Sequence, residues 1–159
     1  MNEKKRTKRW AVAAVLLGAA VLCALWAWHN TGTRPIPTEN AHVGTISILT
    51  KKDGVQNRWS LSGDDLTPEM EEALFQCMGR YSMAKGTIST GNMEITDPYL
   101  HISIWVLPEE GPSYQVNLSS NEHYCWVTLD GKAHRISDGA ALLEEVQALP
   151  WMAEAGITE

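Results

Sequence analysis

Residues 100–119, LHISIWVLPEEGPSYQVNLS, decide the fold of this 159-residue chain. In the first half isoleucine and valine alternate with serine and tryptophan, and in the second half apolar side chains alternate with glutamine, asparagine and serine. A period of two is typical of strands that bury only one face. The PEEGP segment at residues 108–112 is a turn between them. We therefore predict two antiparallel strands with one apolar and one polar face.

Further strand pairs are predicted on both sides of this pair. Dipeptides such as Asp-Gly or Gly-Asn between alternating segments indicate two-residue hairpin turns. Such dipeptides separate three pairs of predicted strands, residues 45–50 and 55–61, 87–90 and 93–96, and 124–129 and 132–136.

Two helices complete the predicted domain. Thr67 is a good N-cap, Pro68 suits the first helical position, and Gly79 suits the end of the helix. A second helix is predicted from Asp138 to Leu149, and Pro150 should end it. Strands and helices in this order predict an α+β fold, in which two helices pack on an antiparallel sheet.

The N-terminal segment predicts a single transmembrane helix over residues 10–28, WAVAAVLLGAAVLCALWAW, which carry no charge. A helix of this length is roughly 28 Å long, close to the ~30 Å thickness of the hydrocarbon core. Residues 1–9 hold five Lys or Arg, so they are predicted to form a cytoplasmic tail, with the rest of the chain outside. The alternative is a signal peptide cleaved after Ala20.

Residues 29–42 are predicted to be an extended tether, because they contain Pro35 and Pro37 and show no hydrophobic period. The extracytoplasmic α+β domain should then span residues 43–159. A basic start, a single signal-anchor span, a short tether and a compact domain form a layout shared by many bacterial envelope proteins. We therefore expect the protein in the cell membrane, in contact with the lipid bilayer through residues 10–28.

The charges are divided unevenly along the chain. Five of the 13 basic residues and one of the 19 acidic residues precede residue 29, so residues 29–159 carry 8 basic and 18 acidic side chains. A domain this acidic is expected to repel nucleic acid, and we predict no nucleic-acid partner. The chain lacks phosphate-loop and dinucleotide motifs, so we also predict no cofactor.

Cys77 and Cys125 fall in the predicted outer domain. Outside the cytoplasm these two residues can form a disulfide bond. The alternative interpretation is a pair of buried thiols that act as small apolar side chains. The sequence leaves both alternatives open.

The sequence suggests one candidate metal site. His123 and Cys125 should point to the same side of a strand, and His134 should join them from the next strand of the hairpin. Imidazole and thiolate groups suit zinc, and three ligands leave one open position. This group is the basis of an alternative function, a small metal-dependent envelope enzyme. No fourth ligand or orienting carboxylate is indicated.

The polar face of the sheet is the most suggestive candidate for a binding surface. If the isoleucines of residues 100–107 face the helices, Trp105, Gln115, Asn117 and Trp126 should all face away. Two indole rings beside two amides suit a surface that binds a peptide or a sugar. The alternative, which we favour, is that the first hairpin covers this face, so that both tryptophans belong to the core. For the protein as a whole, the leading prediction is a non-catalytic domain that binds an envelope protein or glycan.

Overall fold

The computed structural model describes residues 3–90, 95–121 and 124–154, with side chains of the first helix described over residues 15–28. The chain divides into two compact units, Met1–Gly32 and Thr33–Glu159. The second unit is called the domain below. Of the hairpin predicted over residues 87–90 and 93–96, residues 91–94 lie outside the described residues. Residues 87–90 do not form the predicted strand and make only an isolated bridge, from Ile88 to Ala133.

The first unit is a single helix, α1 (Glu3–Asn30). Its described large apolar side chains are all exposed, namely Val15, Leu16, Leu17, Val21, Leu22, Leu25, Trp26 and Trp28. Over the residues that the structure describes, no helix combines the length and the apolar character needed to cross a bilayer.

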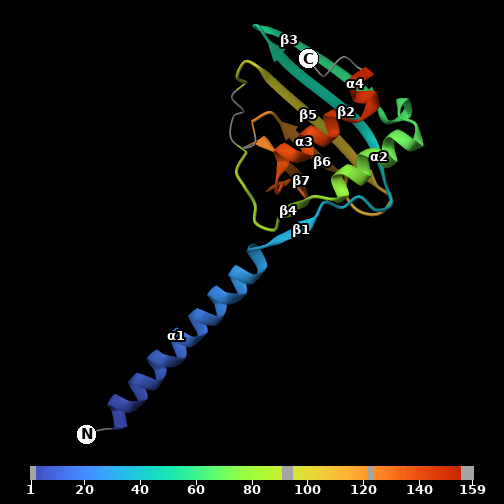
Figure 1. Cartoon of the computed structure of the whole chain (residues 1–159). Helices are drawn as coiled ribbons and strands as arrows, with labels where there is room; N and C mark the ends of the chain where they lie inside the picture. Colours follow the sequence, from blue (N-terminus) through green and yellow to red (C-terminus); the bar gives the residue numbers. More distant parts are fainter. Residues whose placement is uncertain (1–2, 91–94, 122–123, 155–159) are drawn as a thin grey trace. The chain divides into compact units, whose positions relative to one another are not determined.

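The domain contains a six-stranded antiparallel sheet with the strand order β3-β2-β5-β6-β7-β8 (Figure 1). Its strands are β2 (Ala41–Lys52), β3 (Val55–Ser62), β5 (Tyr99–Pro108), β6 (Tyr114–Ser119), β7 (Trp126–Leu129) and β8 (Lys132–Arg135). A second sheet of two short antiparallel strands is formed by β1 (Thr33–Pro35) and β4 (Ser82–Ala84). The predicted α+β fold with antiparallel strands and packed helices is confirmed for the domain.

Three helices pack on one face of the large sheet, α2 (Pro68–Gly79), α3 (Gly139–Gln147) and α4 (Pro150–Glu154) (Figure 1). A short 3-10 helix, η1 (Gly63–Asp65), precedes α2. The core lies between the sheet and the helices, and its residues from both layers include Ile46, Ile48, Ile102, Ile104, Val116, Leu118, Leu74, Met78, Leu142, Val146 and Met152.

Local sequence explains the ends of these elements. The Thr67 side chain accepts a hydrogen bond from the backbone of Met70 at 3.4 Å, and Pro68 opens α2, as predicted. The turns between β2 and β3 and between β7 and β8 use Asp-Gly pairs in which both residues have positive φ. Asp and Gly tolerate this conformation, which matches the twist of the flanking strands.

The C-terminal helix differs from the prediction of one helix over residues 138–149. Helix α3 ends at Gln147, and a separate helix, α4, begins at Pro150. Proline fits the first position of a helix because its missing N–H would have no partner there. Pro150 therefore starts α4, whose Met152 is fully buried.

The predicted tether over residues 29–42 is corrected by the structure, in which the domain begins at Thr33. Strand β1 pairs with β4, and Ile36 lies 2% exposed in the core. The hydroxyl of Tyr114 donates a hydrogen bond to the carbonyl oxygen of Pro37. The prolines suggested free chain, but burial of the isoleucine between them contributes roughly 2 kcal/mol and holds the segment on the domain.

Candidate functional site

The polar side of the large sheet is called the open face below, and it comprises the strand side chains that point away from α2, α3 and α4. The register places them in four rows, Ser62-Thr45-Trp105-Gln115-Thr128-Ala133, Ser60-Ser47-Ser103-Asn117-Trp126-Arg135, Arg58-Leu49-His101-Ser119 and Gln56-Lys51-Tyr99. The intervening isoleucines, valines and leucines of these strands form the core. The four residues of the sequence-based binding surface therefore share one face.

These four residues differ in how accessible they are. Trp105 is 42% exposed, and Gln115 beside it is half-buried and donates a hydrogen bond to the hydroxyl of Ser103. Asn117 and Trp126 are 5% and 9% exposed. Of the two tryptophans, only the ring on β5 is therefore accessible from solvent, whereas Asn117 and Trp126 are buried.

The first hairpin does not lie over the open face, as the alternative interpretation required. Strand β2 pairs along its whole length with β5, edge to edge, and so widens the sheet. Thr45 pairs with Trp105 and Ser47 with Ser103, which brings two more hydroxyl groups to the ring. The sequence did not reveal this pairing, because the two strands are far apart in the chain and only the completed fold pairs them.

A bulge in β2 shapes the surroundings of Trp105. The register shifts between Val43 and Thr45, at Gly44. A Cβ atom at this glycine would lie 3.0 Å from Cδ1 of Leu107 and 3.2 Å from Cδ1 of Trp105. The missing side chain leaves room for these two exposed side chains to lie across β2.

His101 lies on the same face, one row away from Ser103. Its ring stacks on Tyr99 with centroids 6.3 Å apart and an interplanar angle of 7°. Burial lowers the pKa of His101, against a hydrogen bond with Asn117 that raises it. Its Nδ1 atom is buried and has no hydrogen-bond partner among the described residues. At neutral pH the imidazole of His101 is therefore uncharged and adds no positive charge to the open face.

The residues of the sequence-based metal site are committed to other contacts or lie outside the described chain. His123 belongs to the residues that the structure does not describe. His134 is buried on the helix side, and its Nδ1 donates to the carbonyl oxygens of Ala84 and Gly86 at 3.1 and 3.3 Å. Its Nε2 accepts a hydrogen bond from Arg34 at 3.2 Å. Both ring nitrogens of His134 are thus already occupied.

Cys125 and Cys77 are both buried. The Sγ atom of Cys125 exchanges hydrogen bonds with the backbone of Ser119, at 3.3 Å from its nitrogen and 3.4 Å to its oxygen. The Sγ atom of Cys77 lies 3.6 Å from Nη2 of Arg80, and burial raises the pKa of this thiol. The disulfide that the sequence allows is not formed in the structure.

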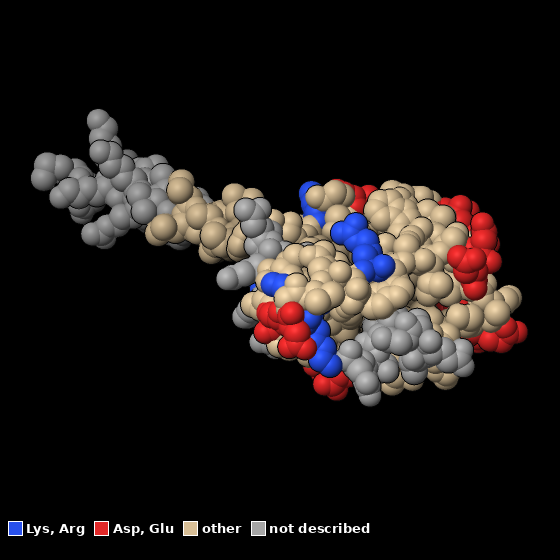
Figure 2. Space-filling view, turned by 90° about the horizontal axis from the view of Figure 1, so that it is seen from above, with Lys and Arg blue, Asp and Glu red and all other residues tan. Residues whose placement is uncertain are grey.

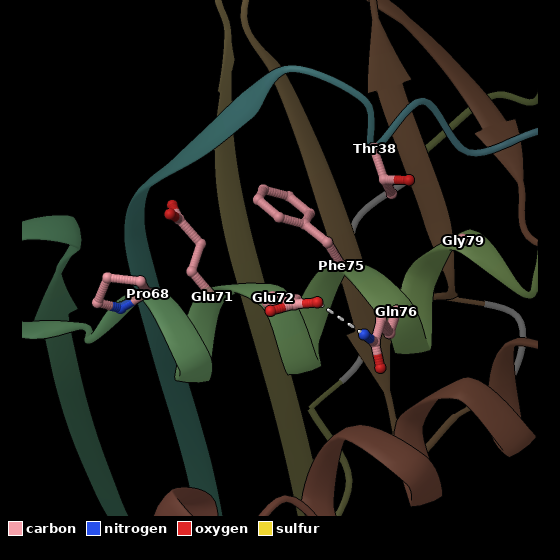
Figure 3. Close-up of a pocket in the computed structure, with 7 residues that line it drawn as sticks. All are labelled: Thr38, Pro68, Glu71, Glu72, Phe75, Gln76 and Gly79. Carbon is pink, nitrogen blue, oxygen red and sulfur yellow. Dashed lines mark hydrogen bonds between the residues drawn. The ribbon is translucent and has the colours of Figure 1, made fainter.

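A cavity of about 460 Å³ lies on the other side of the domain, along α2 (Figure 3). Phe75 and Glu71 point from the helix toward the segment that leads into β2, whereas Gln76 donates a hydrogen bond to Glu72 at 3.1 Å. The Glu71 carboxylate accepts a hydrogen bond from the backbone nitrogen of Val43. This carboxylate therefore attaches α2 to β2 and serves the fold.

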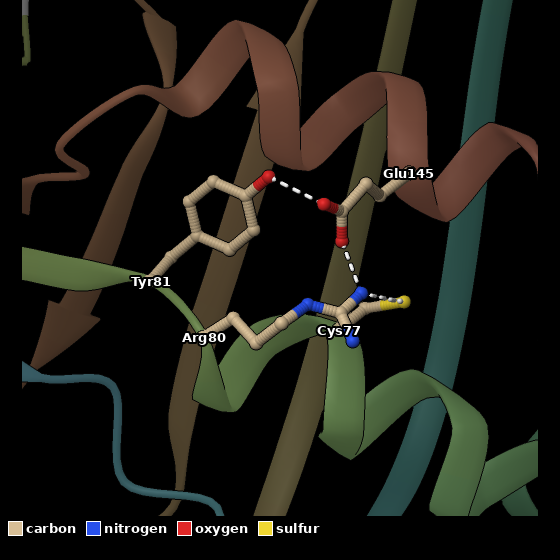
Figure 4. Close-up of polar contacts among 4 residues, drawn as sticks. All are labelled: Cys77, Arg80, Tyr81 and Glu145. Atoms are coloured by element: carbon tan, nitrogen blue, oxygen red, sulfur yellow. Dashed lines mark hydrogen bonds and ion pairs between the residues drawn. The ribbon is translucent and has the colours of Figure 1, made fainter.

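The most concentrated polar cluster of the helix layer joins α2 to α3 (Figure 4). The Glu145 carboxylate accepts hydrogen bonds from Arg80 and, at 2.9 Å, from the hydroxyl of Tyr81. All of its partners lie on the domain itself, so this cluster stabilises helix packing.

Comparison with known protein families, with curated proteins and with solved structures finds no match to this chain.

Proposed function

We propose that this protein is a single-pass membrane protein whose extracytoplasmic domain binds another component of the cell envelope, without catalysis. The uncharged run over residues 10–28 and the basic residues before it support the membrane anchor and its orientation. The open face of the domain supports a binding role. On this proposal α1 holds the domain at the membrane, and the sheet presents a surface to the partner.

The exposure of Trp105 on β5, an inner strand of the sheet, carries the proposal. Large aromatic side chains are usually buried, yet this ring is 42% exposed. Ser103, Thr45 and Gln115 surround it with hydroxyl and amide groups. An exposed indole ring surrounded by neutral hydrogen-bonding groups is typical of surfaces that bind sugars or polar peptides.

The metal-dependent enzyme receives no such support. Among the described residues, no group of three His, Cys, Asp or Glu side chains lies close enough together to hold a metal ion. His123, one of the three residues of that site, lies outside the described residues. The proposal of a binding role rests instead on the exposed ring of Trp105.

The anchor and its orientation are tested by adding protease to spheroplasts that contain the full chain. The domain should be degraded from outside while the N-terminal tail stays protected. Survival of the domain in intact spheroplasts, or its recovery free in the culture fluid, would refute the proposed localisation.

The binding role is tested by photo-crosslinking in living cells. A photoreactive phenylalanine analogue replaces Trp105 in one variant and Gln76, an exposed residue on α2, in a matched control. The proposal expects an adduct with an envelope protein or glycan at position 105 and none at position 76. Equal adducts at both positions, or none at position 105, would contradict it.

A further inference from the structure

The charged residues of the domain are segregated between the sheet and the rest of the fold. The six strands of the large sheet contain no Asp or Glu, although residues 29–159 hold 18 acidic side chains. The same strands contain five of the eight basic residues of this segment, Lys51, Lys52, Arg58, Lys132 and Arg135. The acidic residues that the structure describes belong to turns, helices and connecting segments.

Three of these cations point to the open face. Lys51 pairs with Tyr99, Arg58 pairs with Leu49, and Arg135 pairs with Trp126, all in the rows of the open face. Arg58 and Arg135 are exposed and Lys51 is half-buried. None of the three forms an ion pair within the described part of the chain. Among the described residues, these three cations of the open face therefore have no carboxylate within ion-pair distance.

The helix side of the domain has the opposite charge. Asp64 and Asp65 in η1 and Glu69, Glu71 and Glu72 in α2 follow one another along this side. In the view of Figure 2 the largest gathering of acidic side chains, at the right, has no Lys or Arg within it. Charges separated in this way direct an anionic ligand to one face even though the whole domain is acidic.

We propose that the open face binds an anionic polysaccharide, an inference that rests on the binding role proposed above. Trp105 offers its ring to the C–H groups of a sugar. Ser47, Ser103 and Gln115 offer hydroxyl and amide groups to the sugar hydroxyls. Lys51 and Arg58 pair with carboxylate or phosphate groups along the chain.

The dimensions of the face suit an extended polymer. Arg58 lies on β3 and Arg135 on β8, at the two edges of the sheet. Strands lie ~4.8 Å apart, so these two cations are separated by roughly 24 Å across the sheet. A linear polymer that crosses the strands meets a cation near each edge and the indole ring between them.

Other anionic partners fit this face less well. Peptides that bind sheets usually pair with the backbone of an edge strand. The exposed Trp105 ring instead lies on β5, whose backbone is paired on both sides, with β2 and with β6. A membrane surface requires a broad exposed apolar patch. Among the described strand residues of the open face, the exposed large apolar side chains are Trp105 and Leu107.

The test measures binding of the full chain, in detergent micelles, to polygalacturonate, a carboxylated polysaccharide. Dextran serves as the neutral polysaccharide and poly-L-glutamate as the acidic polypeptide. The proposal expects binding to polygalacturonate alone, weakened by added salt. The double variant Lys51→Gln/Arg58→Gln should bind about tenfold more weakly.

A matched control removes the same charge from other positions. The variant Lys85→Gln/Lys132→Gln changes two exposed cations that do not belong to the rows of the open face and should bind within about twofold of the parent. Thermal unfolding of both double variants checks that each is folded. Trp105→Ala should weaken binding while its dependence on salt stays unchanged, because the ring carries no charge.

Three outcomes would overturn the proposal. These are no binding to polygalacturonate by the folded parent, equal binding to poly-L-glutamate, and equal losses in the two double variants. If binding fails but photo-crosslinks at position 105 identify a protein partner, the binding role stands and the polysaccharide does not. If both experiments fail, the open face is not a binding surface.

Discussion

Tyr81 donates its phenolic hydrogen to Oε1 of Glu145 over 2.9 Å, and this contact joins residues 64 positions apart in the chain. The other oxygen of the carboxylate accepts the guanidinium of Arg80. The hydrogen bonds from Arg80 and Tyr81 lower the pKa of Glu145 below its usual value. Burial, followed by the hydrogen bond to this carboxylate, raises the pKa of Tyr81 to about 12.

The first prediction concerns stability in acid. A carboxylate whose pKa is lower in the folded than in the unfolded state stabilises the fold at pH values above about 4.5, its unfolded pKa. That contribution is lost as the pH falls through the lower, folded pKa. We therefore expect Glu145→Gln to lower Tm at neutral pH, and to lower it by progressively less as the pH falls below about 4.5. Thermal unfolding across this range measures the difference.

Glu144 supplies the control for this prediction, because it is the exposed neighbour of Glu145 on the same helix. Glu144→Gln should leave Tm close to that of the parent at every pH. If Glu145→Gln lowered Tm equally in neutral and acidic solution, its ionised carboxylate would not be the stabilising group.

The second prediction concerns ionisation of Tyr81 in alkali. A tyrosine whose pKa is raised on folding contributes stability below its unfolded pKa of about 10, and this contribution is lost as the pH rises through about 12. Ultraviolet absorbance measures how many tyrosines ionise as the pH of the folded chain is raised. Compared with the parent, Tyr81→Phe should form one phenolate fewer, and the difference should appear near pH 12. Loss of a phenolate that titrates near pH 10 instead would contradict the prediction.

The sheet was largely predictable from the sequence because its signal is local. Alternation in β5 and β6 and the Asp-Gly turns after Lys52 and Leu129 are visible in short segments, and the structure has strands at these places. Thr67 and Pro68 likewise mark the start of α2. Each of these features depends on residues close together in the chain.

The remaining features depend on contacts between distant segments. Strand β1 exists because β4 lies beside it, and Ile36 is buried because it joins a core built from distant segments of the chain. The pairing of β2 with β5 joins distant segments in the same way and places Lys51 and Arg58 on the open face. The sequence could have supplied one signal for that surface, since acidic residues are absent from every alternating segment that became a strand of the large sheet.

The third prediction concerns close packing at the start of α3. A Cβ atom at Gly139 would lie 2.3 Å from Cβ of Cys125, which no rotation of a side chain can relieve. We expect Gly139→Ala to reduce the free energy of unfolding by about 3 kcal/mol. Denaturant unfolding followed by tryptophan fluorescence measures this loss.

Gly79→Ala is the matched substitution at the end of α2. A Cβ there would meet only Oγ1 of Thr38 at 3.2 Å, the end of a side chain that can rotate. This variant should unfold within about 0.5 kcal/mol of the parent. Similar losses for the two alanines would show that α3 can move away from Cys125.

The fourth prediction tests whether the segment before β2 belongs to the domain. Ile36 is 2% exposed, so Ile36→Ala should lower the free energy of unfolding by about 3 kcal/mol, as for other buried isoleucines. Thr33→Ala, at an exposed position in β1, should change it by less than about 0.5 kcal/mol. Protease should also cut near Pro37 faster in Ile36→Ala than in the parent, because the hydrogen bond from Tyr114 cannot hold the segment alone. If Ile36→Ala unfolded like Thr33→Ala, residues 33–38 would be a free tether, and the domain would begin at β2.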